Sequence, residues 1–95
     1  MHLQFRGEIF VWRGPAPYFF VALPPAEARR IAGVARSVTY GWGVIPVTAS
    51  LGATHFTTSL FPKDGGYLLP LKAAVRRAEA VDEGDIVEIA LDIAM

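Results

Sequence analysis

The residues of this chain best suited to catalysis are His55 and the hydroxyl side chains that follow it. His55, Thr57 and Ser59 alternate along a predicted strand, so an imidazole and two hydroxyls share one face. A hydroxyl nucleophile also needs an acid to orient the imidazole and a strained turn to hold the hydroxyl, and no motif supplies either. We therefore interpret His55 as a half-buried strand histidine beside β-favouring threonines. An unrecognised enzyme stays an alternative.

Metal and cofactor chemistry has little sequence support. The chain has no cysteine and only two histidines, His2 and His55, so thiolate sites and disulfides are excluded and few metal ligands remain. The Gly-Trp-Gly stretch at residues 41–43 is typical of a turn and lacks the spacing of a phosphate-binding or dinucleotide-binding loop. We expect no cofactor and no bound metal.

Ligand binding is the function that the sequence favours most. We expect an aromatic and cationic groove lined by Trp42, Tyr67, Lys72 and Arg76. Lys72 and Arg76 lie four residues apart on one face of a predicted helix, where like charges repel slightly. An anionic small molecule or a protein partner would offset this repulsion, although Glu79 and the acids of the last strand could also do so.

Two arginine pairs raise DNA binding as the alternative function. Arg29 and Arg30 lie on one predicted helix, and Arg76 and Arg77 lie on another. Phosphate neutralisation needs such a cationic surface. The charge balance argues against DNA binding. The chain has nine basic and nine acidic residues, and residues 78–95 carry six acids and no base.

Composition predicts one compact domain covering residues 1–95. Of its residues 53% are hydrophobic and 19% are charged, and the apolar residues come in short bounded runs. No apolar run approaches the ~20 residues of a membrane helix. The first residues lack the pattern of a signal peptide, so we expect a cytoplasmic protein without membrane contact.

Alternating apolar and polar residues predict a mainly β fold. A half-buried strand is predicted at residues 3–13, and from Phe10 and Trp12 onward its second face becomes aromatic, which predicts cover on both sides. The wholly apolar run at residues 18–23 predicts a central strand. A hairpin is expected at residues 45–61, with its turn near Gly52, and Pro46 predicts an edge, a bulge or an outward position. The last strand should turn Val87, Ile89, Leu91 and Ile93 inward.

Two short helices are predicted, each preceded by proline. The first follows Pro24 and Pro25 and has an apolar seam of Ala28, Ile31, Ala32 and Ala35. The second follows Pro70 and has a seam of Leu71, Ala74, Val75 and Ala78. Leu23 and Pro24 precede Leu69 and Pro70 by 46 residues, and the arginine pairs are 47 apart, which indicates a duplicated strand–proline–helix unit.

The stretch GYLLPLKAAVRRAEAVDEGDIVEI, residues 66–89, resembles the looped-hinge helix of the AbrB and MazE transcription factors, with Pro70, the second arginine pair, Gly84 and Asp85 at matching positions. Over nearly its whole length the chain is more similar to a family of small bacterial domains, domain of unknown function nineteen-oh-five. That similarity rests on GWGVIPVTASLG at 41–52, TSLFP at 58–62, YLLPLKAAVRRAE and GDIV. The resemblance implies a double-split β-barrel and implies no activity.

These observations predict a mainly β, single-domain double-split β-barrel with two short helices and a pseudo-twofold internal repeat. In this arrangement one chain supplies both halves that AbrB-like proteins take from two chains. The leading function is that of a binding or interaction module for an anionic small molecule or a protein partner. DNA binding of the AbrB type is the alternative.

Overall fold

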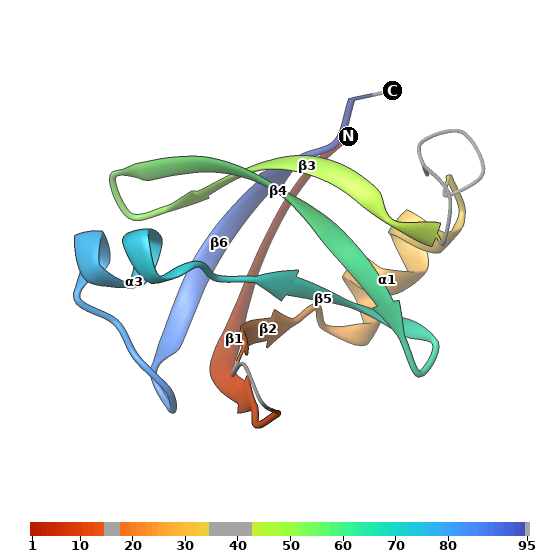
Figure 1. The fold of residues 1–95 in the computed structure, drawn as a ribbon. Coiled ribbons are helices and arrows are strands. Elements are labelled where there is room, and N and C mark those ends of the chain that lie inside the picture. Colours follow the sequence, from red (N-terminus) through yellow and green to blue (C-terminus); the bar gives the residue numbers. More distant parts are fainter. Residues whose placement is uncertain (15–17, 35–42, 95) are drawn as a thin grey trace.

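The computed structural model of the chain describes residues 1–14, 18–34 and 43–94. Six strands within these ranges close into an antiparallel barrel, with two short helices outside it (Figure 1). The strands are β1 (His2–Trp12), β2 (Tyr18–Ala22), β3 (Ile45–Leu51), β4 (Thr54–Lys63), β5 (Gly66–Pro70) and β6 (Ile86–Asp92), and the helices are α1 (Pro25–Ala32) and α3 (Ala73–Glu79). Around the barrel the order is β1-β2-β5-β4-β3-β6. The predicted mainly β barrel is confirmed.

The barrel consists of two interlocked halves with the same order of elements. One half contains β1, β2, α1 and β3, and the other contains β4, β5, α3 and β6. The last strand of each half pairs with the first strand of the other, so β3 pairs with β4 and β6 pairs with β1. The middle strands β2 and β5 pair with each other, as do β3 and β6. The predicted internal repeat is therefore present in the topology.

The strand register locates the pseudo-twofold relation at the β2–β5 pair. Val21 lies opposite Leu69, and the Leu23 N–H donates to the Tyr67 carbonyl at 3.0 Å while the Leu71 N–H donates to the Phe19 carbonyl at 2.8 Å. Equivalent residues are thus 48 apart, because Leu69 follows Val21, and Leu71 follows Leu23, by that number. The sequence spacings of 46 and 47 missed this register, since Pro24 corresponds to Lys72, not to Pro70.

The core fills the barrel with the inward residues of every strand. The predicted inward face of the last strand is confirmed, because Val87, Ile89, Leu91 and Ile93 are all buried. The helices add Ile31 from α1 and Val75 from α3. Burying one such aliphatic side chain contributes about 1.5–3 kcal/mol. One shared core therefore holds both halves together.

Glycines and one aspartate set the predicted turns. Gly52 has φ +58° between β3 and β4, and Gly84 has φ +91° before β6. Between β4 and β5, Asp64 and Gly65 have φ +51° and +80°, so the turn at 62–66 is a two-residue hairpin loop with both central residues left-handed. Such a loop fits the right-handed twist of the flanking strands, which extend closer to the turn than their sequences indicate.

Pro46 lies at a locally unpaired edge, as predicted. β3 pairs with β4 from Ile45 to Leu51, but with β6 only from Thr48 onward. Pro46 therefore has a neighbouring strand on one side only. At such an edge position a residue without a backbone N–H can be accommodated. Its side chain points out of the barrel between the buried Ile45 and Val47.

The apolar run at 18–23 and the two predicted helix seams are less buried than the sequence suggests. The strand at 18–22 has a strand on each side, as predicted, but only its Val21 is buried and Tyr18 is 55% exposed. Of the predicted second seam, Leu71, which precedes α3, and Val75 are buried as expected, but Ala74 and Ala78 are exposed. Of the predicted first seam, Ala28 and Ile31 are buried, Ala32 is exposed, and Ala35 lies outside the described residues. A single-layer barrel has only one inner face, so apolar residues on the other side of a strand point outward.

No helix within the described ranges is long and apolar enough to cross a membrane.

Candidate functional site

Five aromatic side chains point outward from neighbouring strands of the barrel. On β1, Phe10 and Trp12 alternate with the buried Ile9, and the register places Phe10 opposite Phe20 and Trp12 opposite Tyr18 of β2. Ring centroids are 5.9 Å apart for Phe10 and Phe20 and 6.3 Å apart for the pairs Trp12–Tyr18 and Tyr18–Phe20. We call this surface the aromatic face, defined by Phe10, Trp12, Tyr18, Phe20 and Phe61 of β4.

The aromatic face is open to solvent in the part of the chain that the structure describes. Trp12 is 53% exposed, Tyr18 55% and Phe61 45%. The sequence predicted cover on both sides of β1 from Phe10 onward, and the described residues leave Trp12 more than half uncovered. Several large exposed rings on one surface are typical of an interaction site rather than of ordinary surface.

Two adjoining hollows lie on the aromatic face and share Tyr18, Phe20 and Phe61. The apolar hollow has a volume of about 690 Å³ and is completed by Phe10, Trp12, Ala22, Pro62, Lys63, Asp64 and Leu68. The lysine hollow has a volume of about 700 Å³ and is completed by Thr57, Thr58, Ser59, Pro70 and Lys72. We refer to the two hollows together as the groove. Its walls combine flat apolar surface with hydroxyl groups and a cation.

Lys72 gives the groove a positive charge without a neighbouring carboxylate. It is exposed and precedes the first turn of α3 as its N-cap residue. Among the described residues, ion pairs within 4.0 Å join only His2 to Asp92 and Arg13 to Glu83, so the Lys72 ammonium has no acidic partner. Thr57 and Ser59 offer hydroxyl groups beside it. This end of the groove suits an anionic group.

The four predicted ligand residues do not gather in one hollow. Trp42 lies outside the described residues. Tyr67 lines a smaller hollow of about 290 Å³ beside the β4–β5 turn, and Arg76 lines one of about 400 Å³ together with Arg77. Of the three that the structure describes, Lys72 alone lies in the groove of the aromatic face. Ligand binding by Tyr67 and Arg76 stays a prediction.

Arg76 is held by an aromatic ring rather than by an acid. Its Cζ atom lies 3.5 Å from the centroid of the Phe19 ring, which is a cation–π contact. Its Nε atom is buried and has no hydrogen-bond partner among the described residues. Glu79, the acid expected to offset it, instead accepts a hydrogen bond of 2.5 Å from the Thr54 hydroxyl. The guanidinium therefore contributes to packing between α3 and β2.

The arginine pairs predicted for nucleic acid lie at separate places. Arg29 and Arg30 are exposed on α1, and Arg77 is exposed on α3. Figure 1 shows α1 and α3 at opposite ends of the barrel. The two pairs therefore form two small cationic patches rather than one continuous surface.

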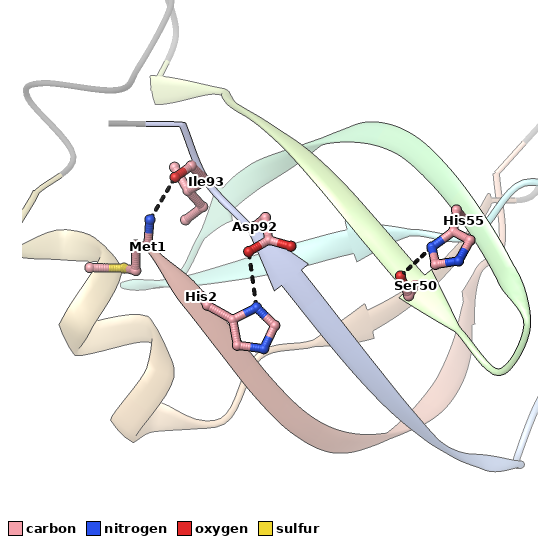
Figure 2. A network of polar contacts seen from close by, with 6 residues as sticks. All are labelled: Met1, His2, Ser50, His55, Asp92 and Ile93. Atoms are coloured by element: carbon pink, nitrogen blue, oxygen red, sulfur yellow. Dashed lines mark hydrogen bonds and ion pairs between the residues drawn. The ribbon is translucent and has the colours of Figure 1, made fainter.

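The histidines form two exposed polar pairs, drawn in Figure 2. His55 Nδ1 lies 2.7 Å from the Ser50 Oγ, and His2 Nδ1 lies 2.9 Å from an Asp92 carboxylate oxygen. Sequence reasoning missed Ser50, because it meets His55 only through the cross-strand register. Within the described ranges no acid hydrogen-bonds His55, and no group of three or more His, Asp or Glu residues could hold a metal. The Ser50–His55 pair thus lacks the third member of a triad.

Comparison with known proteins adds a family but no activity. The family model described as Domain of unknown function (DUF1905) matches residues 5–91. The match extends from β1 to β6 and so includes both halves of the barrel. No curated protein matches the chain.

Proposed function

The chain belongs to the family Domain of unknown function (DUF1905), and from its own geometry we propose that it is a binding module whose site is the groove on the aromatic face. The ligand is an anionic molecule with a flat apolar part. The observation that carries the proposal is the exposure of Trp12, Tyr18 and Phe61 on the same face as Lys72, which has no acidic partner within the described ranges.

The exposed rings supply the apolar part of the binding free energy. Tyr18 and Phe61 line both hollows, so a flat ligand placed there covers rings that are about half exposed in the chain alone. Removing ~100 Å² of apolar surface from water contributes about 2.5 kcal/mol. Stacked or edge-to-face ring contacts add about 0.5–1.5 kcal/mol.

Lys72 supplies the preference for negative charge. A cation beside apolar walls interacts more strongly with an anion than a fully solvated one does, because the walls exclude water from one side. The hydroxyls of Thr57 and Ser59 can donate to the same anionic group. The groove thus offers apolar ring surface and a positive charge, which together suit the anionic ligand that the sequence favours.

A titration with 8-anilinonaphthalene-1-sulfonate tests the proposal, because this dye has flat rings and one negative charge. We expect saturable binding at one site per chain, with the far-ultraviolet circular dichroism of the folded protein unchanged. Tyr18→Ala should weaken binding about tenfold, a loss of ~1.4 kcal/mol. Lys72→Gln should weaken it about threefold, within the range for an exposed charge.

Arg29→Gln is the matched control, because Arg29 is an exposed cation on α1 and lines neither hollow of the groove. It should leave dye binding unchanged. Equal affinities for the unmodified protein, Tyr18→Ala and Lys72→Gln would contradict the proposal.

Binding of duplex DNA is the second candidate, supported by the exposed Arg29, Arg30 and Arg77 and by the resemblance to AbrB. A titration with a DNA duplex at about 50 mM and about 200 mM NaCl checks it, because phosphate contacts give affinity a steep salt dependence. Loss of that binding in Arg29→Gln/Arg30→Gln would favour this candidate over the groove.

A further inference from the structure

We infer that the groove of the aromatic face binds single-stranded nucleic acid, with bases on the exposed rings and phosphates at Lys63 and Lys72. The inference rests on the proposed function and names the class of its ligand. Three properties of the groove support the inference: its extent over two hollows, its number of aromatic rings and the position of its cations.

The groove has more volume than one small molecule requires. Each hollow alone has the volume of a small-molecule site, about 690 and 700 Å³, and the two adjoin at Tyr18, Phe20 and Phe61. A ligand that occupies both hollows must pass across these three residues. An elongated ligand therefore fits the groove better than a compact one.

The rings outnumber the charges. Five aromatic side chains line the groove, and neighbouring ring centroids lie 5.9–6.3 Å apart from Phe10 through Phe20 and Tyr18 to Trp12. Repeated rings suit a ligand with repeated flat groups, and each base stacked on an aromatic ring strengthens binding by roughly tenfold. An acidic peptide would use the lysines but leave most of these rings uncovered.

The cations lie in different hollows. Lys63 lines the apolar hollow and Lys72 lines the lysine hollow, and Asp64 is the one acid among the residues lining either. A ligand with a single acidic group can reach one lysine, whereas a phosphodiester backbone can reach both. The charges thus complement a polyanion that passes along the whole groove.

Exposed bases are required for this mode of binding. In a duplex the base faces are stacked inside the helix, so rings on a protein surface can cover them only in a single strand. The inference therefore predicts a preference for single strands, which separates it from the duplex candidate on Arg29 and Arg30.

Fluorescence anisotropy with labelled oligo(dT) and oligo(U) of about 12 nucleotides tests the inference. Both strands should bind at about 50 mM NaCl, and more tightly than the matched duplex. Tyr18→Ala and Phe61→Ala should each weaken binding about tenfold. Tyr18→Leu should do so as well, because it keeps apolar surface and removes the ring.

Lys63→Gln and Lys72→Gln should each reduce the salt slope of oligo(dT) binding by about 0.7. Arg29→Gln/Arg30→Gln should leave both affinity and slope unchanged. Far-ultraviolet circular dichroism and a cooperative thermal unfolding transition of each variant confirm that the fold is intact. These variants change exposed side chains, so all of them should pass this check.

Control ligands distinguish single-stranded nucleic acid from other classes of anionic ligand. Thymidine monophosphate binding as tightly as oligo(dT) would contradict an elongated ligand, and poly-L-glutamate binding as tightly would show that charge alone is recognised. Equal binding of duplex and single strand would also overturn the inference. If neither oligonucleotide binds while the sulfonate dye still binds in a Tyr18-dependent way, the inference fails and the proposed function stands.

Discussion

The barrel has two unlike outer faces over one core. On the aromatic face, large rings stand about half exposed, and the nearby Lys72 has no acidic partner among the described residues. The other surface, which we call the polar face, consists of His2, Gln4, Ser50, His55 and Asp92. There the short side chains bond to one another across strands, as in His2–Asp92 and Ser50–His55 (Figure 2). Four of the five polar-face side chains thus pair with one another, whereas the aromatic face leaves apolar surface exposed for a partner.

One strand contributes to both faces because its neighbour changes. β1 pairs with β6 from His2 to Glu8 and with β2 from Ile9 to Trp12. Gly7 lies just before this change, and a Cβ atom there would be 2.6 Å from Val21 Cγ1. The missing side chain lets β2 approach β1 closely, where the outer face becomes aromatic.

The largest effect should come from the core that lies under both faces. Leu69 of β5 and Leu91 of β6 are both fully buried, so Leu69→Ala and Leu91→Ala should each lower the free energy of unfolding by about 2–5 kcal/mol. Urea denaturation measures both. A cost below ~1 kcal/mol for Leu69→Ala alone would show that the aromatic face does not cover the same core.

Periodicity predicted the inward residues but not the use of the outer face. Val87, Ile89 and Leu91 alternate with smaller or charged residues, so their burial follows from the sequence. Tyr18 and Phe20 were interpreted only as part of an apolar, central strand. The sequence of such a strand is the same whether its outer face is covered by another layer or exposed to solvent. The repeated aromatic residues from Phe10 onward were the available signal.

Contacts between residues far apart in the sequence could not be predicted either, because they depend on the strand register. The Arg76–Phe19 stacking joins residues from different halves of the chain, and its geometry depends on the β2–β5 register. Local spacing instead pointed to Glu79 as the neighbour of Arg76. The separation of Tyr67, Lys72 and Arg76 into different hollows likewise follows from the path of the strand and helix, not from residue type.

The close approach of β2 to β1 at Gly7 gives a second test of the difference between the aromatic face and the polar face. Gly7→Ala should lower the free energy of unfolding by about 1–3 kcal/mol, because the added methyl group meets Val21. Gly66→Ala is the matched control, since its nearest neighbour would be the Lys63 carbonyl at an ordinary 3.7 Å. Thermal and urea unfolding of the two variants should differ clearly, and equal stabilities would refute this account of how β1 passes between the faces.

A third prediction separates binding from folding. Trp12→Ala should lower the free energy of unfolding by about 1–3 kcal/mol and leave the protein folded, because the side chain is 53% exposed and buries only part of its surface. The same change should weaken binding of the sulfonate dye about tenfold, measured by dye fluorescence. Gln4→Ala on the polar face should leave dye affinity unchanged, and an equal loss in both variants would remove the distinction between the faces.

The smallest effects are expected on the polar face. His2 and Asp92 are largely exposed, with side-chain exposures of 56% and 67%, so Asp92→Asn should cost no more than about 1 kcal/mol of unfolding free energy. Ser50→Ala should have a similarly small effect. Chemical denaturation checks both variants, and a cost above ~2 kcal/mol would show that these pairs are more than surface contacts.

The most direct test of the binding surface is a two-dimensional amide NMR titration with 8-anilinonaphthalene-1-sulfonate on the full chain. The account predicts that the largest shift changes fall on the second half of β1, on β2, on β4 from residue 57 to 63, on β5 and around Lys72. Changes on the polar face and on α1 should be small. Largest changes at His55, Ser50 and Asp92, or at Arg29 and Arg30, would contradict a binding site on the aromatic face.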